Sequence, residues 1–207
     1  MDYLEELDTS QLLGFAASGD QSAAEQLLVR HEPRLRQMIN LRLDDRLRAR
    51  LDPSDVVQET LLEAHRRLPE YLKRRSVGFY PWLRNLAWQR LIDLHRHHVR
   101  SNMRSVRREN LNQAANDHSV RYLADKLQSS PSQHMLHEEV QQRVQDALQQ
   151  LSEADRELLL LRHAEDLSVK EVADVLNVPQ GTVKSRHFRA LERLQRFLEE
   201  AGNGDLS

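Results

Sequence analysis

The chain has 207 residues, of which 30% are charged and 5% aromatic, and only six are glycine and six proline. This composition favours small helical bundles, and the near absence of alternating β-branched runs makes a β-sheet unlikely. The sequence has no cysteine, which excludes disulfides and thiolate metal sites. Its acidic N-terminus does not resemble a signal peptide, and no apolar run approaches the length of a membrane span. We expect a soluble, cytoplasmic, all-α protein without membrane insertion.

Charge is distributed unevenly around the net value of −2. Residues 1–25 include six acidic residues and no lysine or arginine, whereas residues 77–108 include seven arginines and a single acidic residue. Residues 180–196 include five lysines and arginines against one glutamate. This alternation suits a protein that contacts both a protein partner and a polyanion.

Apolar residues recur at helical spacing through the N-terminal half. Gly19 is expected to close the first helix, and Pro33 to kink or break the second, because proline removes a backbone donor. Asp52 before Pro53 supplies a capping side chain and a first-turn proline for the third. The pattern predicts helices over Ser10–Ser18, Gln21–Arg48, Pro53–Arg67 and Phe79–Arg108.

Residues 109–133 lose this periodicity and gain Asn, Gln and Ser, which predicts a polar linker with a short helix around Val120–Leu127. Ser152 can cap a later helix, and Ser168 with Glu171 has the form of a capping box. The predicted organisation is two small helical domains, residues 1–108 and 134–207, joined by the linker. The second domain is expected to contain helices over His134–Gln150, Glu153–His163, Ser168–Leu176 and Gln180–Glu200.

The last two predicted helices have the features of a helix-turn-helix. Ala173 is small enough for a close helix crossing, and Asn177 can adopt the positive φ that the turn needs. A helical hairpin with a solvated basic face is the alternative, but the turn chemistry favours DNA binding. The inward stripe of the last helix is expected at Val183, Ala190, Leu191 and Leu194.

These C-terminal segments resemble region 4 of the sigma-70 family, at Glu157–Arg162, Glu165–Ser168 and Thr182–Arg186. The N-terminal half resembles region 2 of the same family. There, Asp55–Leu62 is similar to the helix that docks on the polymerase clamp. Phe79–Arg84 and Leu91–Arg96 are similar to the helix that melts and recognises the minus-ten element.

Because the chain has no room for the further domains of housekeeping members, it resembles the short extracytoplasmic-function class. The resemblance implies an all-α sigma factor with a region 2 bundle and a region 4 helix-turn-helix. Its expected partners are core RNA polymerase, through the clamp helices and the flap, and promoter DNA, with an anti-sigma protein as a further candidate.

The resemblance and the residue chemistry together assign three groups of candidate residues. The polymerase-binding group shares one helix face and offers acidic and amide groups to a basic partner helix: Asp55, Gln58, Glu59 and Leu62. The minus-ten group supplies cationic and aromatic surface for phosphates and an unstacked base: Tyr80, Arg84, Trp88, Gln89, Arg90, Arg96 and Arg100. The minus-thirty-five group lies at the start of the recognition helix: Thr182, Lys184, Ser185, Arg186, Phe188 and Arg189.

Several residues allow two interpretations. Trp82 has the register of a core residue, which we expect in preference to a base-binding role. His95, His97 and His98 suggest a metal site, but no carboxylate completes a ligand set and arginines surround them, so we expect them to face phosphates. His187 stands at an inward position where the family usually has an apolar residue.

No phosphate-binding glycine-rich loop and no nucleophile with a base at a known spacing occur in the sequence. An enzyme is therefore not expected, and no catalytic, cofactor-binding or metal-binding residue is assigned. The alternative function is a free-standing helix-turn-helix regulator. That alternative leaves Asp55–Leu62 and the arginine-rich helix without a role.

Overall fold

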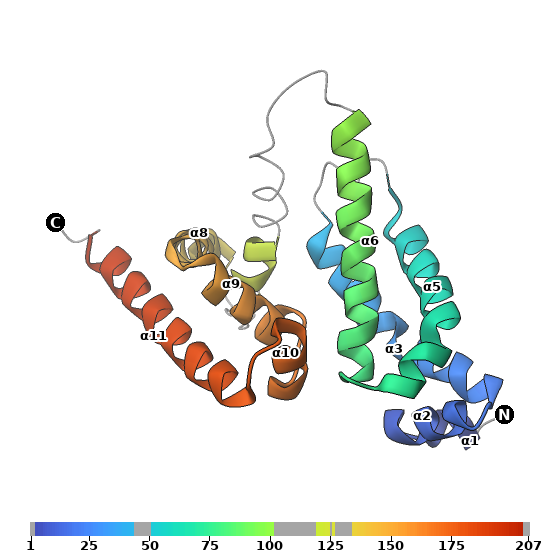
Figure 1. Ribbon diagram of the computed structural model, residues 1–207. Helices are drawn as coiled ribbons and strands as arrows, with labels where there is room; N and C mark the ends of the chain where they lie inside the picture. The colour runs from blue at the N-terminus through green and yellow to red at the C-terminus, as the bar shows by residue number, and fades with distance from the viewer. Residues whose placement is uncertain (1–2, 44–50, 102–118, 125, 127–133, 205–207) are drawn as a thin grey trace. The chain divides into compact units, whose positions relative to one another are not determined.

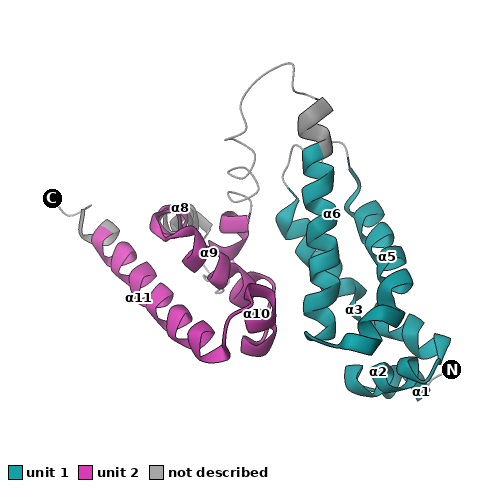
Figure 2. Cartoon of the chain, in the orientation of Figure 1, with its two compact units in different colours: residues 1–107 teal, residues 108–207 magenta. Residues whose placement is uncertain are grey.

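The computed structural model describes residues 3–43, 51–101, 119–124, 126 and 134–204, and the side chains of these residues except at 97–101, 134–141 and 201–204. Helices form almost all of this part, and no strand occurs in it, which confirms the all-α class (Figure 1). None of the helices described is both long enough and apolar enough to cross a membrane. The chain divides into two compact units, residues 1–107 and 108–207 (Figure 2).

Helix α3 is the central element of the N-terminal unit, because it packs against α2, α5 and α6. Asp8 and Gln11 form a capping box at the start of α2. Gly19, with φ of +95°, turns the chain after α2, and Asp20 then caps α3, so the predicted helix end at Gly19 is confirmed. The helices of this unit are α1 (Tyr3–Glu6), α2 (Thr9–Ala17), α3 (Gln21–Arg42), α5 (Pro53–Arg74) and α6 (Phe79–Ser101).

Two helices continue through an internal proline. Helix α3 continues through Pro33, so of the expected kink or break the break does not occur. Pro33 has no amide hydrogen, so the carbonyl of Val29, four residues earlier, lacks the donor that it would have in a regular helix. Because Pro33 and Val29 are both exposed, this carbonyl can bond to water instead. Helix α5 passes Pro69 and ends later than predicted, because Leu68 and Tyr71 still pack into the core. The predicted continuations 44–48 of α3 and 102–108 of α6 lie outside the described residues.

The core of the N-terminal unit contains an aromatic cluster at the junction of α5 and α6. Trp82 stacks on Tyr71 with ring centroids 4.5 Å apart, and Phe79 lies 5.6 Å from Trp82. Trp82 is partly buried against the apolar core, which confirms the core interpretation. The largest side chains with almost no exposed surface in this unit are Leu12, Leu27, Leu35, Met38, Ile39, Leu43 and Leu83.

Helix α11 is the long element of the C-terminal unit and packs against α8, α9 and α10. The predicted helix 153–163 changes to a wider π-helical turn at Leu160, where the Glu165 amide donates to the Leu160 carbonyl. The buried Asp155 carboxylate accepts a hydrogen bond from Arg193, which ties α9 to α11. The elements are α8 (His134–Gln150), α9 (Glu153–Leu159), η1 (Leu160–Ala164), α10 (Val169–Leu176) and α11 (Gln180–Gly204).

Part of the expected linker belongs to the C-terminal unit. Residues 119–124 are helical, in agreement with the predicted short helix, and Val120 and Leu123 are buried. Lys126 forms an ion pair of 2.5 Å with Asp166, in the loop that follows η1. These contacts are more typical of a packed segment than of a solvated polar tether. The rest of 109–133 lies outside the described residues.

The burial of Leu83 predicts a large effect on stability. Leu83→Ala should lower the free energy of unfolding of the N-terminal unit by about 2–5 kcal/mol, because it removes a fully buried leucine and leaves a cavity. Leu62→Ala is the matched control, since Leu62 is 61% exposed, and should change it by less than about 0.5 kcal/mol. Both tryptophans of the chain lie on α6, so tryptophan fluorescence in a urea titration follows this unit. Equal effects of the two substitutions would contradict the packing described.

Candidate protein-binding and nucleic-acid interfaces

The turn between α10 and α11 has the geometry that the sequence predicted. Ser168 and Glu171 form a reciprocal capping box, in which each backbone amide donates to the other residue's side chain at 2.8 and 3.2 Å. Asn177 ends α10 in the left-handed conformation, with φ of 52°. The buried Ala173 lies one turn earlier, and its carbonyl accepts from the Val178 amide at 3.1 Å. The two helices therefore meet as a helix-turn-helix.

Helix α11 buries one side and exposes a cationic side. Val183, Ala190 and Leu194 are buried as predicted, whereas Leu191 is only partly buried. Phe188 is 62% exposed, which is unusual for an aromatic residue in a small domain. Within the described residues, the exposed cations of the minus-thirty-five group have no ion-pair partner. The exposed members of that group are Lys184, Ser185, Arg186, Phe188 and Arg189, while Thr182 is partly buried at the helix start.

His187 lies beside the recognition face and contacts His163 at the end of η1. Their Nε2 atoms are 2.9 Å apart and their rings stack at 5.1 Å. Burial lowers the pKa of His163 below its ordinary value of 6.5, and His187 and Arg162 lower it further. Burial also lowers the pKa of His187, followed by the effect of Arg162. The inward position predicted for His187 is therefore occupied by one member of a stacked imidazole pair rather than by an apolar residue.

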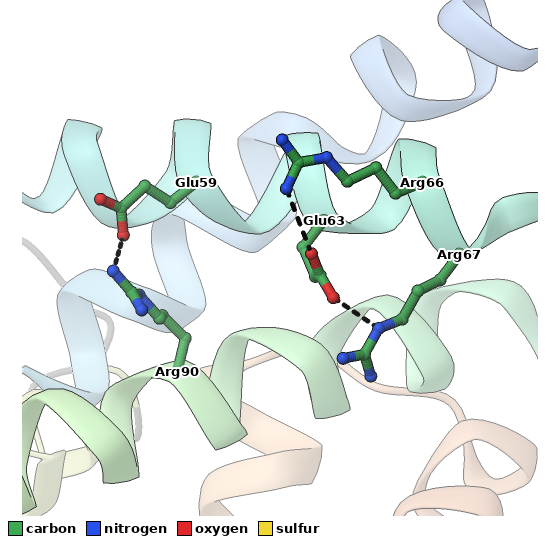
Figure 3. Close-up of polar contacts among 5 residues, drawn as sticks. All are labelled: Glu59, Glu63, Arg66, Arg67 and Arg90. Carbon is green, nitrogen blue, oxygen red and sulfur yellow. Dashed lines mark hydrogen bonds and ion pairs between the residues drawn. The ribbon is translucent and has the colours of Figure 1, made fainter.

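The polymerase-binding group lies on the exposed side of α5. Its members Asp55, Gln58, Glu59 and Leu62 are all exposed. The opposite side of the helix carries buried residues, among them Val56 and Val57, as the periodicity requires. Glu59 also forms an ion pair with Arg90 of α6 (Figure 3).

The minus-ten group separates into buried and exposed members. Tyr80 is 3% exposed, its hydroxyl donates to the Arg34 carbonyl at 3.2 Å, and the Arg34 guanidinium lies 3.8 Å from its ring centre. Arg84 is 4% exposed. A surface role for Tyr80 and Arg84 is therefore corrected: both side chains belong to the interior, because the first turns of α6 pack against α3.

Trp88 is the aromatic member that remains partly accessible. It packs on the core, and the guanidinium carbons of Arg42 and Arg84 lie 5.4 and 5.7 Å from its ring centre. No local sequence pattern marks Arg34 or Arg42, because their contacts with aromatic rings of α6 depend on the packing of two helices that are distant in sequence.

Other members of the minus-ten group line the exposed side of α6. Gln89, Arg90 and Arg96 are exposed, and Arg96 forms an ion pair of 3.7 Å with Asp93. The side chain of Arg100 lies outside the described residues, as do those of His97 and His98. In the part of the chain that the structure describes, no three histidine, aspartate or glutamate side chains are arranged to hold a metal ion.

Comparison with known proteins places these features in a family. The family model for sigma-70 region 2 matches residues 27–101, and that for sigma-70 region 4 matches residues 141–194. The RNA polymerase sigma-H factor of Pseudomonas aeruginosa is 30% identical over 194 residues, which cover 91% of this chain and 93% of that protein. The ECF RNA polymerase sigma-E factor of Escherichia coli K12 is 31% identical over 199 residues, which cover 94% of this chain and 96% of that protein.

A solved structure is also similar. The structure of CnrH in complex with the cytosolic domain of CnrY includes a chain with 25% identity and a TM-score of 0.52, covering 93% of this chain and 99% of that chain. A helical bundle followed by a helix-turn-helix with a cationic recognition helix defines a DNA-binding transcription protein. The chain belongs to the sigma-70 family, in its extracytoplasmic-function class, and is a sigma factor for transcription initiation. This family consists of initiation factors rather than enzymes.

The histidine pair predicts a pH dependence of stability. Because folding lowers the pKa of both imidazoles, the unfolded chain binds more protons than the folded chain at acidic pH. The contribution of the pair to stability is therefore full above about pH 6.5 and is lost as the pH falls below that value. His187→Gln should therefore reduce the drop in the melting temperature of the C-terminal unit between about pH 7.5 and about pH 5.5. Circular dichroism follows the melting of the whole chain. Tryptophan fluorescence follows the N-terminal unit alone, because both tryptophans lie on α6, so the transition of the C-terminal unit can be told apart.

His65→Gln serves as the control, because His65 is exposed on α5 and belongs to the other unit. It should leave the acid-induced drop of the C-terminal unit unchanged. An equally large drop in His187→Gln and in the unaltered chain would show that the pair does not contribute.

Proposed function

We propose that this sigma factor binds core RNA polymerase through the exposed face of α5 and recognises promoter DNA through α11 and α6. The observation that carries the proposal is the cationic, aromatic face at the start of α11, directly after a helix-turn-helix turn. Its exposed cations have no internal partner among the described residues, so they remain available to phosphates and base edges. The protein would act in the cytoplasm, together with the polymerase.

The face of α5 suits a basic helix of the polymerase clamp. Asp55 and Glu59 supply negative charge, Gln58 can both donate and accept hydrogen bonds, and Leu62 provides exposed apolar surface. The four residues span eight positions of one helix, or roughly 10 Å of its length. That length is enough for two turns of a partner helix. The C-terminal unit is the candidate for the flap contact.

The start of α11 suits the major groove at the minus-thirty-five element. Arg189 can donate two hydrogen bonds to one guanine, and Phe188 can contact a thymine methyl group. Thr182 and Arg186 are assigned to phosphate contacts, as the resemblance to sigma-70 region 4 implies. Lys184 and Ser185 complete the surface that would face base edges.

The exposed side of α6 suits the minus-ten element. Arg90, Arg96 and Arg100 are the candidates for phosphate contacts, and Gln89 and Trp88 are those for contact with an unstacked base. Tyr80 and Arg84 are no longer included, because their burial leaves them to support α6 from within. Phosphodiester chemistry would belong to the polymerase.

An anti-sigma protein is a further proposed partner. CnrH, which resembles this chain in structure, is solved in complex with the cytosolic domain of another protein, CnrY. The exposed residues Phe15, Val29 and Leu62 of the N-terminal unit provide apolar surface that such a partner would cover.

Run-off transcription with purified core polymerase and a promoter library tests the proposed function. We expect the chain to direct initiation from a subset of promoters that share minus-ten and minus-thirty-five sequences. A free-standing regulator would bind DNA but would give no transcript with core polymerase alone. Absence of any chain-dependent transcript across the library would therefore remove the proposal.

The docking face predicts a selective loss of polymerase binding. Replacing Gln58 and Glu59 together with Ala should weaken binding to core polymerase by about tenfold or more, because it removes central polar groups of the interface. DNA binding by the α11 surface should be unchanged, since that surface lies in the other unit. A pull-down with purified core measures the effect, and Arg66→Ala, an exposed residue of the same helix, is the matched control. Unchanged core affinity in the double variant would exclude this face as the docking surface.

Arg186 and Arg189 of the recognition helix are expected to show different defects when replaced. Arg189→Ala should relax the preference at one promoter position, with a loss of about 1–3 kcal/mol of discrimination, because it removes a bidentate contact to a base. Arg186→Ala should preserve the preference but lower the affinity for all sequences and flatten its salt dependence. Selection of bound sequences from a random pool distinguishes the two. If Arg189→Ala selects the same motif as the unaltered chain, its assignment as a base-reading residue is wrong.

A further inference from the structure

An ion pair joins the two proposed binding surfaces of the N-terminal unit. Glu59 lies on the polymerase-binding face of α5, and Arg90 lies among the phosphate-binding candidates of α6. The carboxylate and the guanidinium are in direct contact, although 31 residues separate them in sequence (Figure 3). The two residues are assigned to different external partners, polymerase and DNA, so their contact with each other needs an explanation.

Neighbouring ion pairs of the same two helices differ in kind. Glu63 pairs with Arg66 and Arg67, three and four positions later on α5 (Figure 3). Asp93 pairs with Arg96 on α6 in the same way. Such pairs follow from helical spacing and connect no two surfaces. The Glu59–Arg90 pair depends instead on the packing of α5 against α6.

Both charges of the pair are open to competition. The side chains of Arg90 and Glu59 are 44% and 51% exposed, so water can solvate either group when its partner leaves. Ion pairs with this exposure are weak, because solvent screens their attraction and two long side chains lose freedom. A basic helix would attract Glu59, and a DNA phosphate would attract Arg90, more strongly than they attract each other.

We propose that the Glu59–Arg90 ion pair couples polymerase docking to DNA binding, because each external partner competes with it for one of the two charges. In the free chain, Glu59 neutralises Arg90 and lowers the affinity for nucleic acid. When polymerase engages Glu59, Arg90 becomes available to a phosphate. The coupling is reciprocal, so DNA bound at Arg90 also favours polymerase at Glu59. This inference rests on the proposed function.

The first arm of the test needs no polymerase. The full-length chain is titrated against a short fluorescent single-stranded oligonucleotide, and binding is followed by anisotropy at several salt concentrations. Glu59→Gln removes the charge but keeps the shape, so it should raise the affinity about two- to fivefold, the range expected for loss of one exposed ion pair. The slope of log affinity against log salt should steepen by about 0.7, which corresponds to one additional phosphate contact.

Two variants control for a general effect of charge. Glu63→Gln removes an equal charge from the same helix, but the partners of Glu63 lie on α5 itself, so it should change the affinity much less. In an Arg90→Gln background, Glu59→Gln should have no effect beyond that of Glu63→Gln. The inference is wrong if Glu59→Gln leaves the affinity unchanged, or raises it equally with and without Arg90. Circular dichroism checks that each variant is folded.

The second arm measures the reciprocal effect on core polymerase. Arg90→Gln frees Glu59 and should raise the affinity of the full-length chain for purified core about two- to fivefold, whereas Arg67→Gln should not. If the unaltered chain does not bind core at all, the proposed function fails, and the oligonucleotide arm still decides whether the pair masks Arg90. If core binding is normal but Arg90→Gln does not strengthen it, only the coupling is refuted.

Discussion

The packing of α5 and α6 against the apolar side of α3 determines which of their side chains can meet a partner. Each of these helices has one side that must be buried, and α3 provides the common surface for both. Once Val57 and Leu83 are in the core, the helical period sets the direction of every other residue on α5 and α6. The exposed docking face and the exposed arginines of α6 are therefore consequences of how the apolar residues pack.

In the C-terminal unit, the turn before α11 likewise determines which side chains of that helix are exposed. Asn177 adopts a left-handed conformation, Ala173 leaves room for the neighbouring helix, and Val183 anchors the start of α11. Together they hold the first turns of α11 with their polar side outward. The paired imidazoles of His163 and His187 occupy the position next to this surface, so the packing that supports the recognition helix includes titratable groups.

Exposed charge has a different role in the N-terminal unit from buried charge. Arg84 lies in the interior, where withdrawal of a partner would be costly, so it is suited to support of the fold. Arg90 and Glu59 are half-exposed, and their ion pair can be exchanged at little cost. A weak internal pair is therefore better suited to regulation than a strong one, since external partners can displace it.

Local features of the sequence were sufficient to predict the helices, the capping box of Ser168 and Glu171, the turn at Asn177 and the exposed face of α5. These features depend on residues within a few positions of one another, whose periodicity and capping chemistry are visible in the chain itself. Only the tertiary structure showed that Tyr80 is buried under Arg34, that 119–124 packs into the C-terminal unit, and that Glu59 pairs with Arg90. Each of these observations depends on contacts between segments far apart in sequence. The packing of one helix on another buries or pairs side chains that the sequence pattern alone would place free at the surface.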